Sequence, residues 1–343
     1  MILHILRHWG VRLAFAVAIA LDGPSQSSLA ADGRGYGVFK SIDFVQADTN
    51  TPVLLSGSAY SFAAITQPNG LYSNQITRAS IQSPLGFVDE LMAPPVNTDQ
   101  PFAFGFGAGS QSDLDTYYPT GVYILRLSTA HDSIRVLSLV MSTNSYPTNA
   151  PRVANYLSAQ SIEATAPFVL NWDSFLGGTT NDFISLSLVD SNNLVVFRSA
   201  TFGQESGMVL LNGTNTSITI PANTLRGGQP YFGYLYFEKD VVNQTTAYPG
   251  ARGLVGFSKA TSFSLRTSSL SFRLESLAVS GKELALRWQG DPGRTYVLQS
   301  LDGLSSNNWT PVVTNVATGN LFTYTYVMTT HIKSRFFRLL LQP

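Results

Sequence analysis

The stretch GDPGRTYVLQSLDGLSSNNWTPV, residues 290–312, contains the pattern that decides the fold of this chain. A Gly-Pro turn precedes TYVLQSL (295–301), in which Tyr296 and Leu298 point to one face and the intervening side chains to the other. A polar loop follows, and Trp309 is expected to re-enter the core as the next strand begins. Alternation with period two between turns predicts a β-strand.

Segments of the same kind recur along the chain, rich in β-branched and aromatic residues and bounded by Gly, Pro, Asn or Asp. They are VYILRLS (122–128), IRVLSLVM (134–141), FVLNWDS (168–174), FISLSLVD (183–190), YFGYLYFE (231–238), LALRWQG (284–290) and LFTYTYVM (321–328). After residue 31, no window of twelve residues carries a convincing helical stripe. Short strands at this spacing predict an all-β chain of tandem antiparallel β-sandwich domains.

The composition excludes several classes of function. Formal net charge is zero, charged residues make up 12%, and no run of Lys or Arg occurs, so a nucleic acid is not an expected partner. The chain has no cysteine. Disulfides, thiolate metal sites and a cysteine nucleophile are therefore excluded.

The N-terminal segment has the organisation of a secretory signal. Arg7 and Arg12 precede the apolar run LAFAVAIAL (13–21), and small residues end the segment at Ala30, where we expect cleavage. The alternative, a membrane anchor, needs about 20 apolar residues, whereas Asp22 stops this run. We therefore expect export to the periplasm, cell surface or exterior, with no transmembrane segment in the mature chain.

Two polar interruptions divide the mature chain. NSYPTNAP (144–151) resembles an extended linker, because residues that precede proline avoid the α region. RTSSLS (266–271) interrupts two strand runs. The predicted organisation is a signal peptide (1–30), an N-terminal β domain (31–150), a second β-sandwich (151–268) and a small C-terminal β module (269–343).

The second unit resembles fibronectin type III and immunoglobulin-like sandwiches of secreted bacterial proteins. LRGGQPY places Leu225 six residues before Tyr231, as in their tyrosine corner, although GGQ stands where type III modules more often have one proline and one glycine. Trp172 stands where such modules keep an early core tryptophan. The resemblance implies structural roles for these three residues and supplies no catalytic group.

The third unit resembles a small C-terminal β module that ends many exported bacterial proteins. The resemblance rests on LALRWQGDPGRTYVLQSLDGLSSNNWTPV followed by SRFFRLLLQP. It implies structural roles for Trp288, Tyr296 and Trp309. Asp302 and Asn307 in its loop are too few to hold calcium, which takes six or more oxygen ligands.

Motifs for catalysis or cofactor binding are missing from the sequence. The mature chain has two histidines, His331 and His131, and we expect His131 to lie in a turn. The sequence contains no G-x-S-x-G motif of a serine hydrolase. No lysine follows a serine by three residues, so the serine-lysine acyl-transfer motif is also missing. The glycines of PFAFGFGAGSQSDLD (101–115) lack the G-x-G-x-x-G spacing, and no helix is expected after them. We instead expect its phenylalanines to fill one face of a strand. We therefore expect no catalytic residue, no metal and no cofactor.

Two features leave alternatives open. Paired carboxylates from distant strands can hydrolyse glycosides, and the available pool is Asp113, Asp115, Asp173, Asp182, Glu205 and Glu238. In YFGYLYF, an inward Tyr231 would leave Phe232, Tyr234 and Tyr236 on the outward face, where aromatic rings can stack on sugars or dock a protein. The other interpretation of this row is packing beneath a neighbouring strand or domain.

The sequence thus favours an exported, non-catalytic interaction or structural module. Its expected partner is a cell-surface protein or a polysaccharide. The first alternative is a carbohydrate-binding protein that accompanies polysaccharide degradation, and the second is a hydrolase with an unrecognised carboxylate pair.

Overall fold

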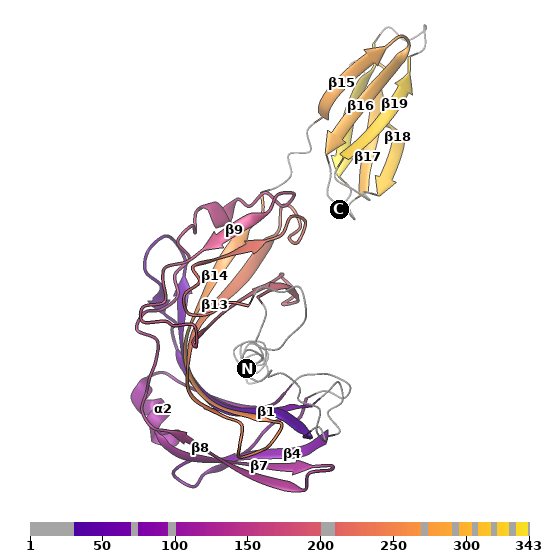
Figure 1. The fold of residues 1–343 in the computed structure, drawn as a ribbon. Helices are drawn as coiled ribbons and strands as arrows, with labels where there is room; N and C mark the ends of the chain where they lie inside the picture. The colour runs from indigo at the N-terminus through magenta and orange to yellow at the C-terminus, as the bar shows by residue number, and fades with distance from the viewer. Residues whose placement is uncertain are drawn as a thin grey trace. The chain divides into compact units, whose positions relative to one another are not determined.

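The computed structural model describes residues 31–69, 75–94, 101–199, 210–268, 274–289, 295–303, 308–316, 321–328 and 334–341 (Figure 1). The predicted signal peptide lies outside them. Strands dominate the described chain, which also contains one short α-helix and a 3-10 turn at Ser158–Gln160. The predicted all-β class of antiparallel sandwiches is confirmed.

The chain forms two compact units. The first comprises the described residues up to Gln160 together with Val169–Ile220 and Pro230–Leu265. The second comprises Ser161–Phe168, Pro221–Gln229 and the described residues from Arg266 onward.

The first unit contains a large sheet with strand order β11-β10-β13-β14-β1-β3-β6, and β2 also pairs with β1. The strands are β1 (Gly33–Gln46), β2 (Val53–Leu54), β3 (Tyr60–Pro68), β6 (Phe102–Ala108), β10 (Phe183–Val189), β11 (Val195–Arg198), β13 (Pro230–Gln244) and β14 (Arg252–Arg266). The pairs β1–β3, β3–β6 and β10–β13 are antiparallel. By contrast, β1 and β14 run side by side in parallel from Gly35↔Arg252 to Gln46↔Phe263 (Figure 1).

A second, four-stranded sheet covers part of the large one. Its order is β5-β4-β7-β8, with β4 (Ile76–Gln82), β5 (Val88–Glu90), β7 (Gly121–Thr129) and β8 (Ile134–Met141). Burial alternates along β8, as period two requires. The inward residues of both sheets form one core, which includes Tyr36, Val38, Phe62, Tyr123 and Leu137. A further pair of strands, β9 (Phe168–Asn171) and β12 (Ser217–Ile220), forms a small separate sheet.

One expectation about the glycine-rich stretch was wrong, because a helix does follow it. Helix α2 (Gln111–Tyr117) begins after Ser110, whose side chain accepts a hydrogen bond from the backbone N–H of Asp113. Ser110 is thus an ordinary N-cap. The phenylalanines of β6 do pack against the core: Phe102 is buried, and Phe104 and Phe106 are partly buried against it.

Strands from both sides of residue 150 belong to the large sheet of the first unit. The predicted limits at 150 and 268 themselves stay predictions. The segment after β8 also packs on this unit, since the rings of Tyr146 and Phe257 meet edge to face with centroids 5.2 Å apart.

The second unit contains two three-stranded sheets. One has the order β15-β16-β19, with β15 (Leu274–Ser280), β16 (Glu283–Gln289) and β19 (Leu321–Val327); the other has the order β18-β17-β20, with β17 (Thr295–Leu301), β18 (Thr310–Val316) and β20 (Phe336–Leu341). Trp288 and Leu298 are buried in the core that they share. Trp309, expected in the core, is instead half-buried beneath the guanidinium of Arg338, which lies 4.4 Å from its ring centroid. A tryptophan just before a strand can use its ring for such a cation–π contact.

Candidate functional site

The aromatic row on β13 is not a continuous exposed platform. Phe232 is 49% exposed, Tyr234 is half-buried and Tyr236 is only 4% exposed. The paired strand β10 is buried at every position, so the sheet is covered on both faces around Tyr236. Tyr236 therefore cannot stack on a sugar in this structure.

The residues expected to be structural in the second predicted domain are buried. Tyr231, Leu225 and Trp172 are each less than 5% exposed. The indole N–H of Trp172 donates to the carbonyl of Asn215 at 2.9 Å.

A tyrosine-corner hydrogen bond occurs on β7. The hydroxyl of Tyr123, a fully buried residue, donates to the carbonyl of Pro119 four residues upstream, at 2.6 Å. The alternation in residues 122–128 predicts the strand but does not single out Tyr123.

Most acids of the carboxylate pool have structural partners. Asp113 binds Ser110, Asp173 pairs with Arg152, and Asp182 accepts hydrogen bonds from Thr179. Glu205 lies outside the described residues. Among the described residues, no group of three or more His, Cys, Asp or Glu side chains could hold a metal ion.

Glu238 belongs to a buried charged cluster on β13 and β14. Glu238 is 2% exposed, the side chain of Asp240 is 5% exposed, and Arg252 lies 4.0 Å from Asp240. Burial raises the pKa of Asp240 to about 7 against the attraction of Arg252, and burial together with Asp240 raises the pKa of Glu238 well above its usual value. Such enclosed carboxylates offer no access to a polysaccharide.

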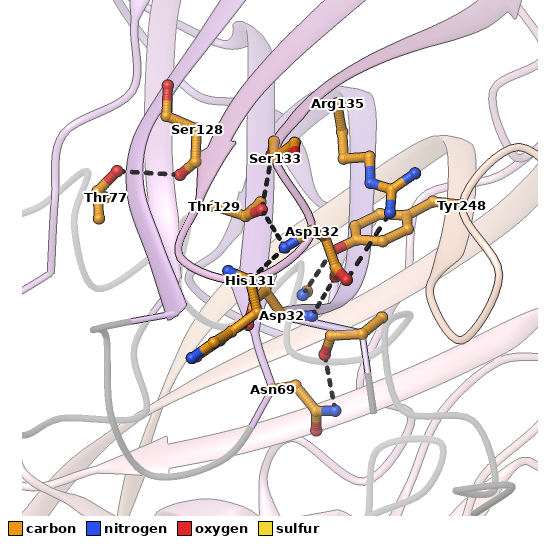
Figure 2. Close-up of polar contacts among 12 residues, drawn as sticks. Asp32, Asn69, Thr77, Ser128, Thr129, His131, Asp132, Ser133, Arg135 and Tyr248 are labelled. Carbon is orange, nitrogen blue, oxygen red and sulfur yellow. Dashed lines mark hydrogen bonds and ion pairs between the residues drawn. The ribbon is translucent and has the colours of Figure 1, made fainter. Parts of the chain in front are cut away.

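A second polar cluster fixes the start of β1, as Figure 2 shows. Asp32 accepts hydrogen bonds from the backbone N–H of His131 at 2.6 Å and of Asp132 at 3.1 Å, and its other oxygen contacts Nδ1 of His131 at 2.7 Å. Asp132 in turn accepts from the backbone N–H of Asp32 and the hydroxyl of Tyr248. His131 was expected in a turn, and it lies between β7 and β8.

The pair formed by Asp32 and His131 has the geometry of two members of a catalytic triad, and among the described residues no nucleophile contacts it. Hydrogen bonds with Asp32 raise the pKa of His131, whose side chain is 77% exposed. Within the described part of the chain, no hydroxyl hydrogen-bonds to the other ring nitrogen of His131. The hydrogen bonds of Asp32 and Asp132 tie the residue that precedes β1 to the turn between β7 and β8.

A third cluster, which sequence reasoning missed, surrounds the ammonium of Lys40 on β1. Lys40 is fully buried, and its Nζ lies 2.5 Å from Oδ1 of Asp115 and 3.3 Å from Oδ1 of Asn144. Asn144 also donates from Nδ2 to Oδ2 of Asp115 at 3.2 Å. The three side chains thus contact one another in a closed triangle. We call Lys40, Asp115 and Asn144 the lysine triad.

The electrostatics of the lysine triad follow from burial. Desolvation lowers the pKa of Lys40 despite the neighbouring carboxylate. Burial opposes the charge of Asp115, but the hydrogen bond from Lys40, together with Gln111, the charge of Lys40 and, to a smaller extent, Asn144, outweighs burial and lowers the pKa of Asp115. One sequence signal was available: Lys40 continues the inward row of Tyr36 and Val38, where an apolar residue is expected.

Comparisons with known proteins give no family for the chain. No family model matches it, and no curated protein matches it. No helix in the described residues is long and apolar enough to cross a membrane.

Several solved structures of β proteins are similar at low level. The "Biofilm associated protein - BSP domain" has 12% identity and a TM-score of 0.18, with 70% of this chain and 30% of that chain covered. The chicken CNTN1 FN1-FN3 domains have 7% identity and a TM-score of 0.18, with 84% of this chain and 90% of that chain covered. A tetra-tandem repeat in the extending region of a large adhesion protein has 10% identity and a TM-score of 0.23, with 87% of this chain and 67% of that chain covered.

Proposed function

We propose that this chain is a non-catalytic structural module of an exported protein, built to hold under tension and to present surfaces to a cell-surface protein or polysaccharide. The observation that carries the proposal is the parallel pair of β1 and β14, the first and last strands of the first unit. The proposal of export rests on the N-terminal signal pattern.

Parallel pairing of the terminal strands sets how a pulling force acts. The chain enters at the start of β1 and leaves the unit at the far end of β14, because the two strands run in the same direction. Tension between these points pulls the strands past each other, so all their hydrogen bonds are loaded together. Forced unfolding is governed by the unfolding rate, which such simultaneous loading keeps low.

The anchor formed by Asp32, His131, Asp132 and Tyr248 supports the same role. It ties the first residues of β1 to the turn between β7 and β8. A force applied at the start of the chain would therefore be shared by the second sheet.

Force spectroscopy on single molecules tests the proposal. Because the chain lacks cysteine, handles can be attached at introduced cysteines. A handle ahead of Asp32 with one at Arg266→Cys shears β1 against β14, whereas handles at Asp48→Cys and Arg266→Cys peel the same pair from one end, where Gln46 lies opposite Phe263. We expect the first geometry to unfold at a force several-fold above the second. Equal forces would overturn the mechanical role.

Carbohydrate recognition is the second candidate function, and the exposed ring of Phe232 beside Tyr234 favours it. The test is a polysaccharide panel for the chain from residue 31 and for Phe232→Ala/Tyr234→Ala, with both proteins shown to be folded. Binding lost in the double variant would support this candidate. If neither protein binds a polysaccharide, the structural role remains as the only one of the two candidates.

A further inference from the structure

The position of Lys40 is unusual for a lysine that serves only in an ion pair. Lys40 lies in the middle of β1, directly opposite Phe257 on β14 and Phe62 on β3, and both phenylalanines are fully buried. Residues opposite one another in neighbouring strands share a face of the sheet. The lysine side chain is therefore flanked by aromatic rings within the sheet.

More rings extend this apolar surrounding. Phe62 stacks on Tyr118 and Tyr123 with ring centroids 4.3 Å and 5.1 Å apart, and Tyr146 meets Phe257 edge to face. Burying a charged amine here costs stability, and a buried ion pair often stabilises a fold no better than apolar residues of similar size. A desolvated amine is, however, a better nucleophile because more of it is uncharged.

The two partners of Lys40 have the chemistry for a covalent step. Asn144 carries a carboxamide, whose carbon an amine can attack, and its oxygen lies 3.3 Å from Nζ of Lys40. Asp115 contacts both the attacking nitrogen and the nitrogen that would leave, at 2.5 Å and 3.2 Å. A single carboxylate is thus placed to accept one proton and donate another.

We propose that Lys40 and Asn144 become joined by an intramolecular isopeptide bond, with Asp115 carrying the protons. Lys40 first gives a proton to the carboxylate of Asp115. The neutral amine attacks Cγ of Asn144, and a bond forms between Nζ and Cγ. Asp115 protonates Nδ2 and takes the second proton from Nζ; the bond between Cγ and Nδ2 breaks, and ammonia leaves.

The reaction balances without an oxidant or another reactant. One amide replaces another, Asp115 returns its second proton to water or ammonia, and the net product besides the cross-link is ammonium. Asn144 lies at the protein surface, so ammonia has a path to solvent. Folding supplies the alignment, because the three groups come from β1, α2 and the segment after β8.

The cross-link would tie β1 to the segment that follows β8. Its test is independent of the mechanical proposal, because it measures a bond and not a force. The chain from residue 31 to 343 is expressed and purified, and its mass is measured by intact-protein mass spectrometry. We expect a mass about 17 Da below that of the sequence, which is one ammonia.

Three variants separate the roles within the triad. Asn144→Ala and Lys40→Arg remove one reacting group, and each should have the full mass of its own sequence. Asp115→Ala keeps both reacting groups but removes the proton carrier, and it should also have the full mass. Asn144→Asp can form the same amide by losing water, about 18 Da. A cross-linked Asn144→Asp protein must therefore have the same mass as the cross-linked wild type.

Peptide mapping locates the bond. A succinimide at Asn212, which precedes Gly213, would also lose ammonia, so mass alone is insufficient. Trypsin digestion should yield a branched peptide that joins the segments around residues 40 and 144, with no cleavage after Lys40. The exposed Asn192→Ala variant is the matched control and should keep the mass loss. Full mass in the wild type, or a mass loss in Asn144→Ala equal to that of the wild type, overturns the proposal.

Discussion

The buried carboxylates of β13 make stability depend on pH in a direction opposite to that of most acids. Asp240 has 5% of its side chain exposed, and burial raises its pKa from 3.8 to about 7, against the attraction of Arg252. We consider Asp240→Asn, which keeps the shape of the side chain and removes its charge.

The sign follows from the linkage of protonation to folding. Below its unfolded pKa, Asp240 is protonated in both states and costs nothing. As pH rises toward the folded pKa, only the unfolded chain releases the proton, so the native state loses stability until about pH 7 and then stays level. A shift of about three units corresponds to about 4 kcal/mol, at 1.36 kcal/mol per unit.

Urea unfolding at pH 4 and pH 8, followed by tryptophan fluorescence, measures the effect. The free energy of unfolding of Asp240→Asn minus that of the wild type should be small at pH 4, where the carboxyl has only begun to ionise in the unfolded chain, and should be larger at pH 8 by up to about 4 kcal/mol. Glu90→Gln is the control, because the exposed Arg78 lowers the pKa of Glu90 and its difference should move the other way. A difference for Asp240→Asn that is equal at both pH values would refute the reasoning.

Three further predictions concern the fold. Tyr123→Phe removes the donor of the part-buried hydrogen bond to the carbonyl of Pro119 and should lower the free energy of unfolding by about 1 kcal/mol in urea denaturation. Gly233→Ala would place a Cβ in steric clash with the ring of Phe263, and the overpacking should cost about 1–3 kcal/mol by the same assay; an unchanged midpoint would show that the ring can move. A fragment of residues 31–150 retains β1 but lacks β14, so its circular dichroism should lack a cooperative thermal transition, which residues 31–268 should show.

Alternation in the sequence predicted which segments are strands but not which strands are neighbours. VYILRLS and IRVLSLVM became β7 and β8, joined by a short turn, and this local pairing follows from the pattern. The parallel partners β1 and β14 are separated by most of the first unit in sequence. Alternation with period two predicts which face of the sheet a side chain occupies, but it does not predict which distant strand will pair with the segment.

The wrong expectation about helix α2 has a definite physical cause. Helix α2 is too short to show a hydrophobic stripe; its signal was Ser110, an N-cap residue before Gln111. The burial of Tyr236 agrees with the second interpretation of the aromatic row, packing beneath a neighbouring strand, because Tyr236 and Leu235 point to opposite faces and are both buried. Alternation assigns faces, whereas exposure depends on what covers each face.

The lysine triad shows why a candidate site of this kind escapes motif reading. Its three members come from separate elements and are far apart in the sequence, so no local sequence pattern predicts that they meet. What remains visible is a conflict: β1 reads as a core strand, yet Lys40 occupies one of its inward positions. A local rule broken in an otherwise consistent strand is the place to look for function. The covalent bond proposed here would explain this position, because a neutral amide between aromatic rings removes the buried charge that an ion pair would keep.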